Sequence, residues 1–237
     1  MRRSLYRWLT GLVMMTATCA HAQVEYNTVQ NIRIYAPAFT PYNTVDGSPY
    51  VPSDTVQNGW LVNGKKRMPA KLRYNTYTGV VEYVQDGKLL TPITSIAEFA
   101  ILAADTMHFQ KGFPATQERS VNDFYQILFD GRKTKLVKYI SATIKTNTDA
   151  MHDDFGKKKF QFREAYYVWV ANGALPSGNS FLTLSEGEMK SVLASKKSLI
   201  TALPQKAEPI EHYVADQKIK VKSWAEFARV LSYLEMH

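Results

Sequence analysis

The sequence has a single cysteine, Cys19, which lies in an apolar segment near its start. The rest of the chain can therefore form no disulfide and supplies neither a thiolate nucleophile nor a cysteine metal ligand. The sequence also lacks a paired-histidine HExxH spacing, a G-x-S-x-G elbow and a D-[TS]-G motif. These absences exclude motif-based routes to catalysis and leave only sites assembled from distant residues.

Long hydrophobic runs are also missing. The apolar run at residues 9 to 20 has about a dozen residues, fewer than the roughly 20 that cross a bilayer. Basic residues precede it and an Ala-x-Ala pattern ends at Ala22, which is typical of a cleaved signal peptide. We therefore predict an exported protein, periplasmic or extracellular, with a signal at residues 1 to 22 and no transmembrane span in the mature chain.

Acidic residues are fewer than basic ones. The chain has 29 Lys and Arg against 21 Asp and Glu, a formal net charge of +8. Loss of Arg2, Arg3 and Arg7 with the signal would lower this charge to +5. Such a balance suits anionic partners, but no nucleic-acid-binding motif accompanies it. We expect a solvated basic surface and, as partner, an envelope protein or an acidic polymer or glycan, and no nucleic acid.

The middle of the chain has the pattern of an antiparallel meander. Residues 23 to 57 are rich in proline and aromatic residues and predict an extended arm, with one strand near residues 31 to 35. Residues 58 to 184 consist of short β-branched and aromatic runs. Asn-Gly and Asp-Gly pairs, which are typical of tight hairpin turns, separate these runs: Asn58-Gly59, Asn63-Gly64, Asp86-Gly87, Asp130-Gly131 and Asn172-Gly173. We predict a curled sheet or a partly open barrel.

One segment of this body has the spacing of a phosphate-binding loop. In GWLVNGKK, residues 59 to 66, Gly59 and Gly64 precede Lys65 as in that motif. The position after the lysine should be Ser or Thr to bind Mg²⁺, but it is Lys66. Trp60, Leu61 and Val62 occupy the positions that should be flexible, so the segment is predicted to be a strand followed by a turn.

Residues 185 to 237 have a helical pattern. Two serines, Ser185 and Ser223, each precede a glutamate by three residues and predict helix starts by the capping-box rule. A middle helix is expected near residues 205 to 216, with Pro209 in its first turn. Apolar residues at helical spacing follow Ser223: Trp224, Phe227, Val230, Leu231 and Leu234. The fold class predicted is α+β, with two or three C-terminal helices packed on the sheet.

Two long segments carry a family resemblance. GKKRMPAKLRYNTYTGVVEYVQDGKLLTPI and the later SKKSLITALPQKAEPIEHYVADQKIKVKSWAEFARVLSYL resemble a group of uncharacterised secreted bacterial proteins. The resemblance covers roughly residues 58 to 235. It implies a signal peptide, a β-rich body with a K-L-R-Y-N-like strand and a lysine-rich helical tail. It implies no activity and no catalytic residue.

Aromatic residues are the best candidates for a binding site. The chain has 14 tyrosines and four tryptophans, and such rings can form platforms for sugars, peptides or apolar ligands. Trp60, Tyr74 and Tyr77 are the candidates, and Tyr74 and Tyr77 are expected to be exposed on either side of a turn. The alternative for any single ring is that it packs the sheet or holds the arm.

A metal site has weaker support. His152, Asp153 and Asp154 could bind a divalent cation, but adjacent acidic residues in a connector also suit a solvated loop. We predict no catalytic residue and no cofactor, and expect an exported binding or interaction protein. The alternatives are a periplasmic hydrolase or other enzyme with a composite site, and a structural assembly component.

Overall fold

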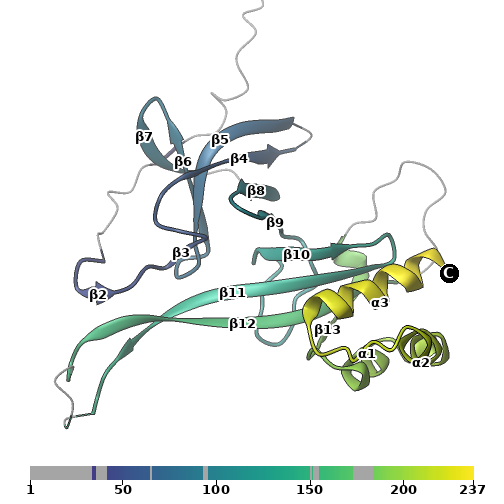
Figure 1. Ribbon diagram of the computed structural model, residues 1–237. Helices are drawn as coiled ribbons and strands as arrows, with labels where there is room; N and C mark the ends of the chain where they lie inside the picture. The colour runs from purple at the N-terminus through teal and green to yellow at the C-terminus, as the bar shows by residue number, and fades with distance from the viewer. Residues whose placement is uncertain are drawn as a thin grey trace, which may run out of the picture. The chain divides into compact units, whose positions relative to one another are not determined.

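The computed structural model describes residues 34–35, 42–64, 66–92, 96–149, 151, 155–172 and 184–237 (Figure 1). The predicted signal peptide, most of the arm before residue 42 and the candidate ligands His152, Asp153 and Asp154 lie outside these residues. Within the described part, no helix is long and apolar enough to cross a membrane.

The strands form one mixed sheet that is curled and open. Its main path runs β1-β7-β6-β5-β4-β8-β9-β10-β11-β12-β13, and these neighbours pair antiparallel. Off this path, β3 pairs antiparallel with β5 and β2 pairs parallel with β12. The bounds are β1 Ile34–Tyr35, β2 Val45–Asp46, β3 Tyr50–Val51, β4 Gln57–Asn63, β5 Lys66–Asn75, β6 Val80–Gln85, β7 Lys88–Pro92, β8 Glu98–Leu102, β9 Thr106–Gln110, β10 Tyr125–Asp130, β11 Thr134–Thr146, β12 Lys158–Ala171 and β13 Gly187–Ser191.

Two of the predicted turns join neighbouring strands as expected. Asn63 is the last residue of β4, and Gly64, with a positive φ angle of 59°, begins the turn to β5. The segment that has the spacing of a phosphate-binding loop is therefore a strand and a turn. Asp86-Gly87 joins β6 to β7, with positive φ angles of 50° and 72°. Both residue types tolerate the left-handed region that a two-residue hairpin turn requires.

Other Asn-Gly and Asp-Gly pairs have different roles. Asn58-Gly59 is not a turn but lies inside β4, opposite Lys71 and Ala70 of β5. A Cβ atom at Gly59 would lie 2.1 Å from the backbone oxygen of Ala100, so this glycine permits close approach of β8. Asp130-Gly131 begins a longer connection, because β11 starts only at Thr134.

We expect Gly59→Ala to destabilise the fold by about 1–3 kcal/mol, because the added methyl group collides with the β8 backbone. Urea unfolding followed by tryptophan fluorescence would measure the change. Asn58→Ala, at the exposed neighbouring position, is the control and should change stability by less than about 0.5 kcal/mol. Equal stability of the two variants would contradict the close approach.

Buried side chains form three clusters. The sheet core lies inside the curl of β4 to β9 and includes Leu61, Leu72, Tyr74, Phe99, Phe109 and Ile140. The helical core joins β11 and β12 to the C-terminal helices. The loop core comprises Phe113, Tyr125, Val137, Tyr167 and Trp169. Phe113 comes from the irregular connection between β9 and β10, where Arg119 also lies over the Tyr139 ring at 4.0 Å.

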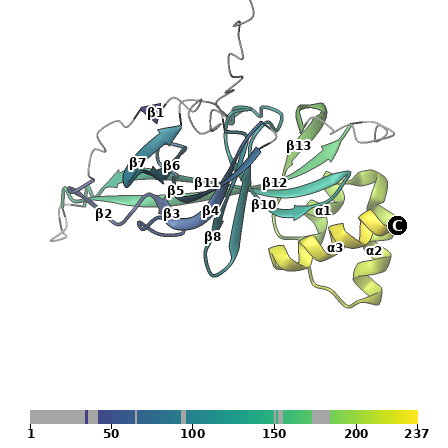
Figure 2. The ribbon, with the colours of Figure 1, turned by 90° about the horizontal axis from the view of Figure 1, so that it is seen from above.

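The C-terminal segment contains three α-helices beside β10 to β13: α1 Lys196–Ala202, α2 Ala207–Asp216 and α3 Trp224–Met236 (Figure 2). Ser223 begins α3 as predicted, because its hydroxyl accepts from the Glu226 N–H at 3.2 Å. The Glu226 carboxylate accepts from the Lys222 N–H at 2.8 Å. Pro209 lies in the first turn of α2. The predicted α+β class with C-terminal helices is therefore confirmed.

The helix start predicted at Ser185 is wrong. Leu184–Glu186 forms one 3₁₀ turn, and Gly187 then begins β13, which pairs with β12. Gly187 lies directly under the Trp169 indole, where a Cβ atom would come within 1.9 Å of Nε1. Pairing with the sheet edge and packing on Trp169 thus override the local capping pattern.

The apolar stripe of α3 is fixed in the helical core. Phe227, Val230 and Leu231 are buried there. We expect Phe227→Ala to lower the free energy of unfolding by about 3–5 kcal/mol, because it leaves a cavity in this core. Met236→Ala, at the exposed end of the same helix, should change it by less than about 0.5 kcal/mol. Denaturant unfolding of both variants is the measurement, and a small loss for Phe227→Ala would show that the tail is not integral to the fold.

Candidate binding surface

The structure places the three predicted aromatic residues in three different environments. Tyr74 is only 2% exposed, so the prediction that it is exposed is wrong. It points into the sheet core, where its ring lies 5.1 Å from Phe109 and 5.4 Å from Phe99, measured between centroids. Leu72 and Tyr74 lie on the same face of β5, since residues two apart in a strand point the same way, and that face is inside the curl.

Tyr77 follows β5 in a turn and is 44% exposed, as predicted. Its ring makes edge contacts with Tyr42 at 5.9 Å and with Phe160 at 5.7 Å. The Tyr42 hydroxyl accepts from the side-chain amide of Asn75 at 3.1 Å. These contacts, together with that of Tyr42 on Phe160 at 5.1 Å, hold residue 42 against β5 and β12.

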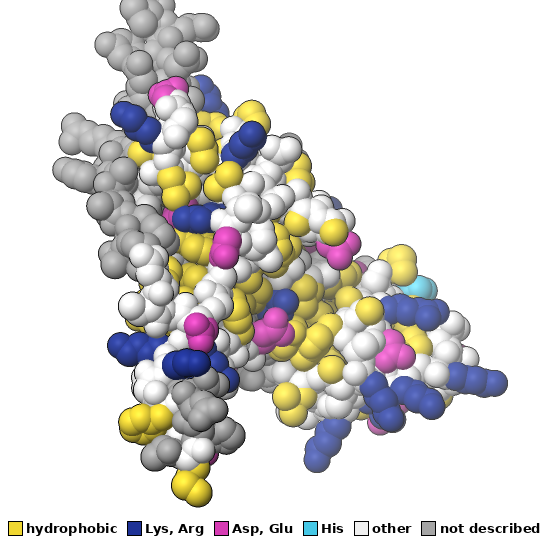
Figure 3. Space-filling model, turned by 60° about the vertical axis from the view of Figure 1, so that its left-hand side comes forward, with side chains coloured by type: hydrophobic (Ala, Val, Ile, Leu, Met, Phe, Trp, Pro, Cys, Tyr) yellow, Lys and Arg dark blue, Asp and Glu magenta, His cyan; other side chains and the backbone are white. Residues whose placement is uncertain are grey.

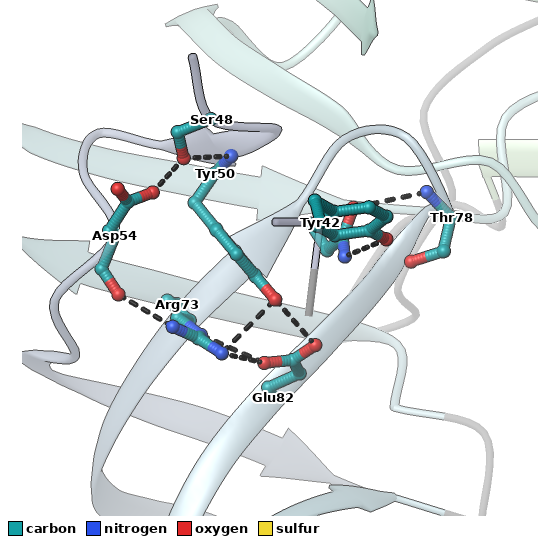
Figure 4. Close-up of polar contacts among 8 residues, drawn as sticks. Tyr42, Ser48, Tyr50, Asp54, Arg73, Thr78 and Glu82 are labelled. Atoms are coloured by element: carbon teal, nitrogen blue, oxygen red, sulfur yellow. Dashed lines mark hydrogen bonds and ion pairs between the residues drawn. The ribbon is translucent and has the colours of Figure 1, made fainter. Parts of the chain in front are cut away.

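A buried ion pair also holds the segment before β4 (Figure 4). Arg73 of β5 and Glu82 of β6 lie opposite each other, and the guanidinium Nη2 is 2.8 Å from the carboxylate. The guanidinium stacks on the Tyr50 ring at 3.8 Å and donates to the backbone oxygen of Asp54 at 2.7 Å. The Tyr50 hydroxyl donates to Glu82 at 3.2 Å. Three backbone segments therefore converge on one charge pair: β5, β6 and residues 50 to 54.

The same network fixes the protonation of Tyr50. Burial, followed by the charge of Glu82, raises the pKa of the Tyr50 hydroxyl far above its ordinary value, although Arg73 opposes this. The hydroxyl therefore stays protonated and remains a donor to the carboxylate. Each of the three side chains has a hydrogen-bond or ion-pair partner within the network. Charges can be buried without a large penalty only under this condition.

Removing one partner of this pair should be costly. We expect Arg73→Met to destabilise by about 3 kcal/mol or more, because Glu82 then keeps a buried charge without its cation. The double variant Arg73→Met with Glu82→Leu should recover part of that loss. Lys138→Met, at the more exposed pair with Glu164, should cost less than about 1 kcal/mol. Urea unfolding of these variants checks the result, and additive losses would show that the pair is not coupled.

Trp60 lies on the face of the sheet opposite the sheet core. Its neighbour Leu61 points into that core, so Trp60 faces the other way and is partly exposed. The Arg67 guanidinium lies over its ring, with Cζ 4.0 Å from the centroid. The His108 ring lies 5.3 Å away at an angle of 53°. The indole is thus placed between a cation and an imidazole.

The strand register explains this arrangement. Trp60 of β4 lies opposite Ala100 of β8, which in turn lies opposite His108 of β9. Ala100 is small and fully buried, so the two rings meet above it. Glu98 lies two residues before Ala100 in β8 and therefore on the same face. Its carboxylate is 2.9 Å from His108 Nε2. Arg67, Trp60, His108 and Glu98 are called the Trp60 cluster below.

The Trp60 cluster offers an oriented cation. Stacking on an indole restricts the Arg67 side chain and leaves the guanidinium edge available for hydrogen bonds. Among the residues that the structure describes, no carboxylate pairs with Arg67. The planar fork of an arginine matches a carboxylate or phosphate in bidentate geometry. Glu98, by contrast, is already in contact with His108.

Sequence reasoning identified Trp60 but missed Arg67, Glu98 and His108. These residues lie up to about fifty positions apart, and only the pairing of four strands brings them together. Within the described ranges, no group of three or more His, Cys, Asp or Glu side chains could hold a metal ion. The predicted role of Trp60 and Tyr77 in ligand binding stays a prediction.

Comparison of the chain with protein-family models, with curated proteins and with solved structures finds no match. The resemblance to secreted bacterial proteins therefore also stays a prediction.

Proposed function

We propose that this protein is an exported binding protein that recognises an acidic polymer or glycan through the Trp60 cluster. The observation that carries the proposal is the Arg67 guanidinium held over the Trp60 ring without a carboxylate partner in the described part of the chain. Arginine at such a position is prepared to accept an anionic group from outside.

Pre-organisation is the main energetic argument. Ordering a long side chain on binding costs about 0.5–1.5 kcal/mol, and stacking on Trp60 has already restricted Arg67. Its hydrogen bonds to a carboxylate would be charge-assisted, which makes them about twice as strong as neutral ones. His108 lies on the far side of the indole from β5 and supports the ring from there.

A polymer suits this surface better than a small molecule. The side chains of the Trp60 cluster lie on a sheet face and are partly exposed, so a single contact there would be weak. A repeating ligand presents many carboxylates and raises the effective concentration at one site. The excess of Lys and Arg over Asp and Glu adds long-range attraction for such a ligand.

The hydrolase alternative has one structural feature in its favour, the contact between His108 and Glu98. A histidine hydrogen-bonded to a carboxylate is the arrangement of a general base, but His108 Nε2 is buried and its contact with Glu98 lacks the geometry of a hydrogen bond. The described contacts of His108 and Glu98, however, are with each other and with the Trp60 ring. We therefore favour binding, with His108 and Glu98 supporting Trp60.

The test uses polygalacturonate, which carries one carboxylate on each sugar, and neutral dextran as the control ligand. We expect calorimetry to detect binding of polygalacturonate and no binding of dextran. Arg67→Gln should weaken it about ten- to a hundredfold, since a hydrogen bond to a charged group contributes about 1.5–3 kcal/mol. Arg67→Lys keeps the charge but loses the planar fork, and should also weaken it.

The matched control is Arg132→Gln, an identical change of charge at an exposed position between β10 and β11. This variant should bind almost as well as the original chain. Equal losses for Arg67→Gln and Arg132→Gln would mean that only net charge attracts the polymer. Absence of binding to polygalacturonate by the unaltered chain would reject the proposal as stated.

A further inference from the structure

The hairpin of β11 and β12 has an edge that the described strands leave partly unpaired. The two strands pair without interruption from Thr134 opposite Val170 to Thr146 opposite Lys158. On the other side of β12, β13 pairs with residues 167 to 171 and β2 with residues 158 and 159. No described strand pairs with residues 160 to 166 on that side. Figure 1 shows this hairpin extending well beyond β13.

The direction of the backbone groups follows from one hydrogen bond. The Val192 N–H donates to the Tyr166 carbonyl at 2.9 Å, so Tyr166 directs its carbonyl towards the β13 side. Residues two apart in a regular strand direct their backbone groups to the same side. The register of β12 with β11 has no shift, so Phe162 and Glu164 direct their N–H and C=O groups to the unpaired edge.

Aromatic side chains and Arg163 lie along this edge together with Glu164, and two lysines lie just before it. Phe162 is 44% exposed, and Lys158, Lys159 and Arg163 lie beside it in sequence. None of these three cations has a carboxylate partner within the described ranges, although Asp46 lies opposite Lys159. Glu164 is occupied, since it pairs with Lys138 at 3.2 Å and accepts from the Tyr166 hydroxyl at 2.5 Å.

Basic and apolar side chains are also found together on the surface at this end of the hairpin. In Figure 3 the lower left part of the surface shows Lys and Arg side chains next to exposed hydrophobic ones, with acidic side chains beside them. An exposed edge strand is a template for pairing with another chain, and edge lysines discourage pairing with a like-charged copy. A partner strand therefore needs the opposite charge.

We propose that residues 160 to 164 of β12 receive an acidic, extended segment of a partner polypeptide as an additional strand. Backbone hydrogen bonds to Phe162 and Glu164 supply the pairing, as in other strand-addition complexes. Carboxylates on the added strand meet Lys159 and Arg163 on one face, and an apolar side chain meets Phe162 on the other. This site shares no residue with the Trp60 cluster, so the two proposals can fail separately.

The probe is a labelled peptide of alternating Glu and Val, titrated with the purified chain and followed by fluorescence anisotropy. We expect saturable binding that weakens with added salt. Two control peptides should not bind: one with Lys in place of Glu, and one with a central Pro in place of Val, which cannot complete the ladder. Equal binding of the Pro-containing peptide would overturn strand addition and leave only charge attraction.

Protein variants test the edge itself. Phe162→Pro removes an outward N–H while leaving the bonds to β11, and it should reduce peptide affinity at least tenfold. Phe162→Ala removes only the ring and should reduce affinity a few fold. Phe155→Ala, at a 61% exposed aromatic position outside the edge, is the matched control and should bind normally. Unchanged affinity for Phe162→Pro would reject the proposal.

Two further measurements keep the interpretation unambiguous. If thermal unfolding shows that Phe162→Pro is not folded, a peptide N-methylated at alternate residues replaces it, because it blocks the same ladder from the other side. Loss of binding by that peptide supports the proposal, and retained binding rejects it. Sedimentation velocity tests the second-copy alternative, and a dimer abolished by Phe162→Ala would show that this edge pairs with itself.

Discussion

Strand β11 contributes side chains to all three buried clusters, so its pairing with β12 is the constraint on which the rest of the fold depends. Leu136 enters the helical core, Val137 the loop core and Ile140 the sheet core. Alternation in a strand accounts for the first two, because adjacent residues face opposite sides. Leu136 and Ile140 share a face of β11 but lie four residues apart. The helices pack on this face near Leu136, and the curled strands β4 to β9 pack on it near Ile140.

The Arg73–Glu82 pair is a second constraint on the curled sheet, because it holds the segment before β4 against β5 and β6. A curled sheet exposes backbone at its ends unless the flanking chain is held in place. The pair joins β5 and β6 to Tyr50 of β3 and to the backbone at Asp54. Its charges are buried at low cost because each has hydrogen-bond partners, whereas an apolar replacement could not also bind the Asp54 carbonyl.

The sequence predicts local structure where local chemistry decides it. Asp86-Gly87 forms a hairpin turn because Asp and Gly adopt the positive φ angles that this turn requires. Ser223 starts α3 because its hydroxyl accepts from the Glu226 N–H. Sequence patterns of the same kind do not predict the structure where tertiary contacts decide it. Gly59 is needed for the approach of β8, and the segment after Ser185 is recruited as an edge strand under Trp169.

The candidate sites show the same division. Trp60 could be named from the sequence because aromatic rings are recognisable binding elements, but Tyr74 is also aromatic and is buried. The difference depends on which face of β5 lies inside the curl, and no local pattern encodes that. Arg67 and His108 become partners of Trp60 only through the register of β5, β4, β8 and β9.

Both proposed surfaces lie on parts of the sheet that the C-terminal helices do not cover. The helices contact β10 to β13 at the end of β12 near Val168, so these helices do not cover the face that carries Trp60 or the edge near Phe162. A sheet whose cores satisfied every face and edge would have no such surfaces. Among the described residues, an oriented arginine and a stretch of strand edge have no partner, and we propose an acidic partner for each. The arginine offers a planar set of donors, and the edge offers a backbone ladder with Lys158 and Lys159 at one end.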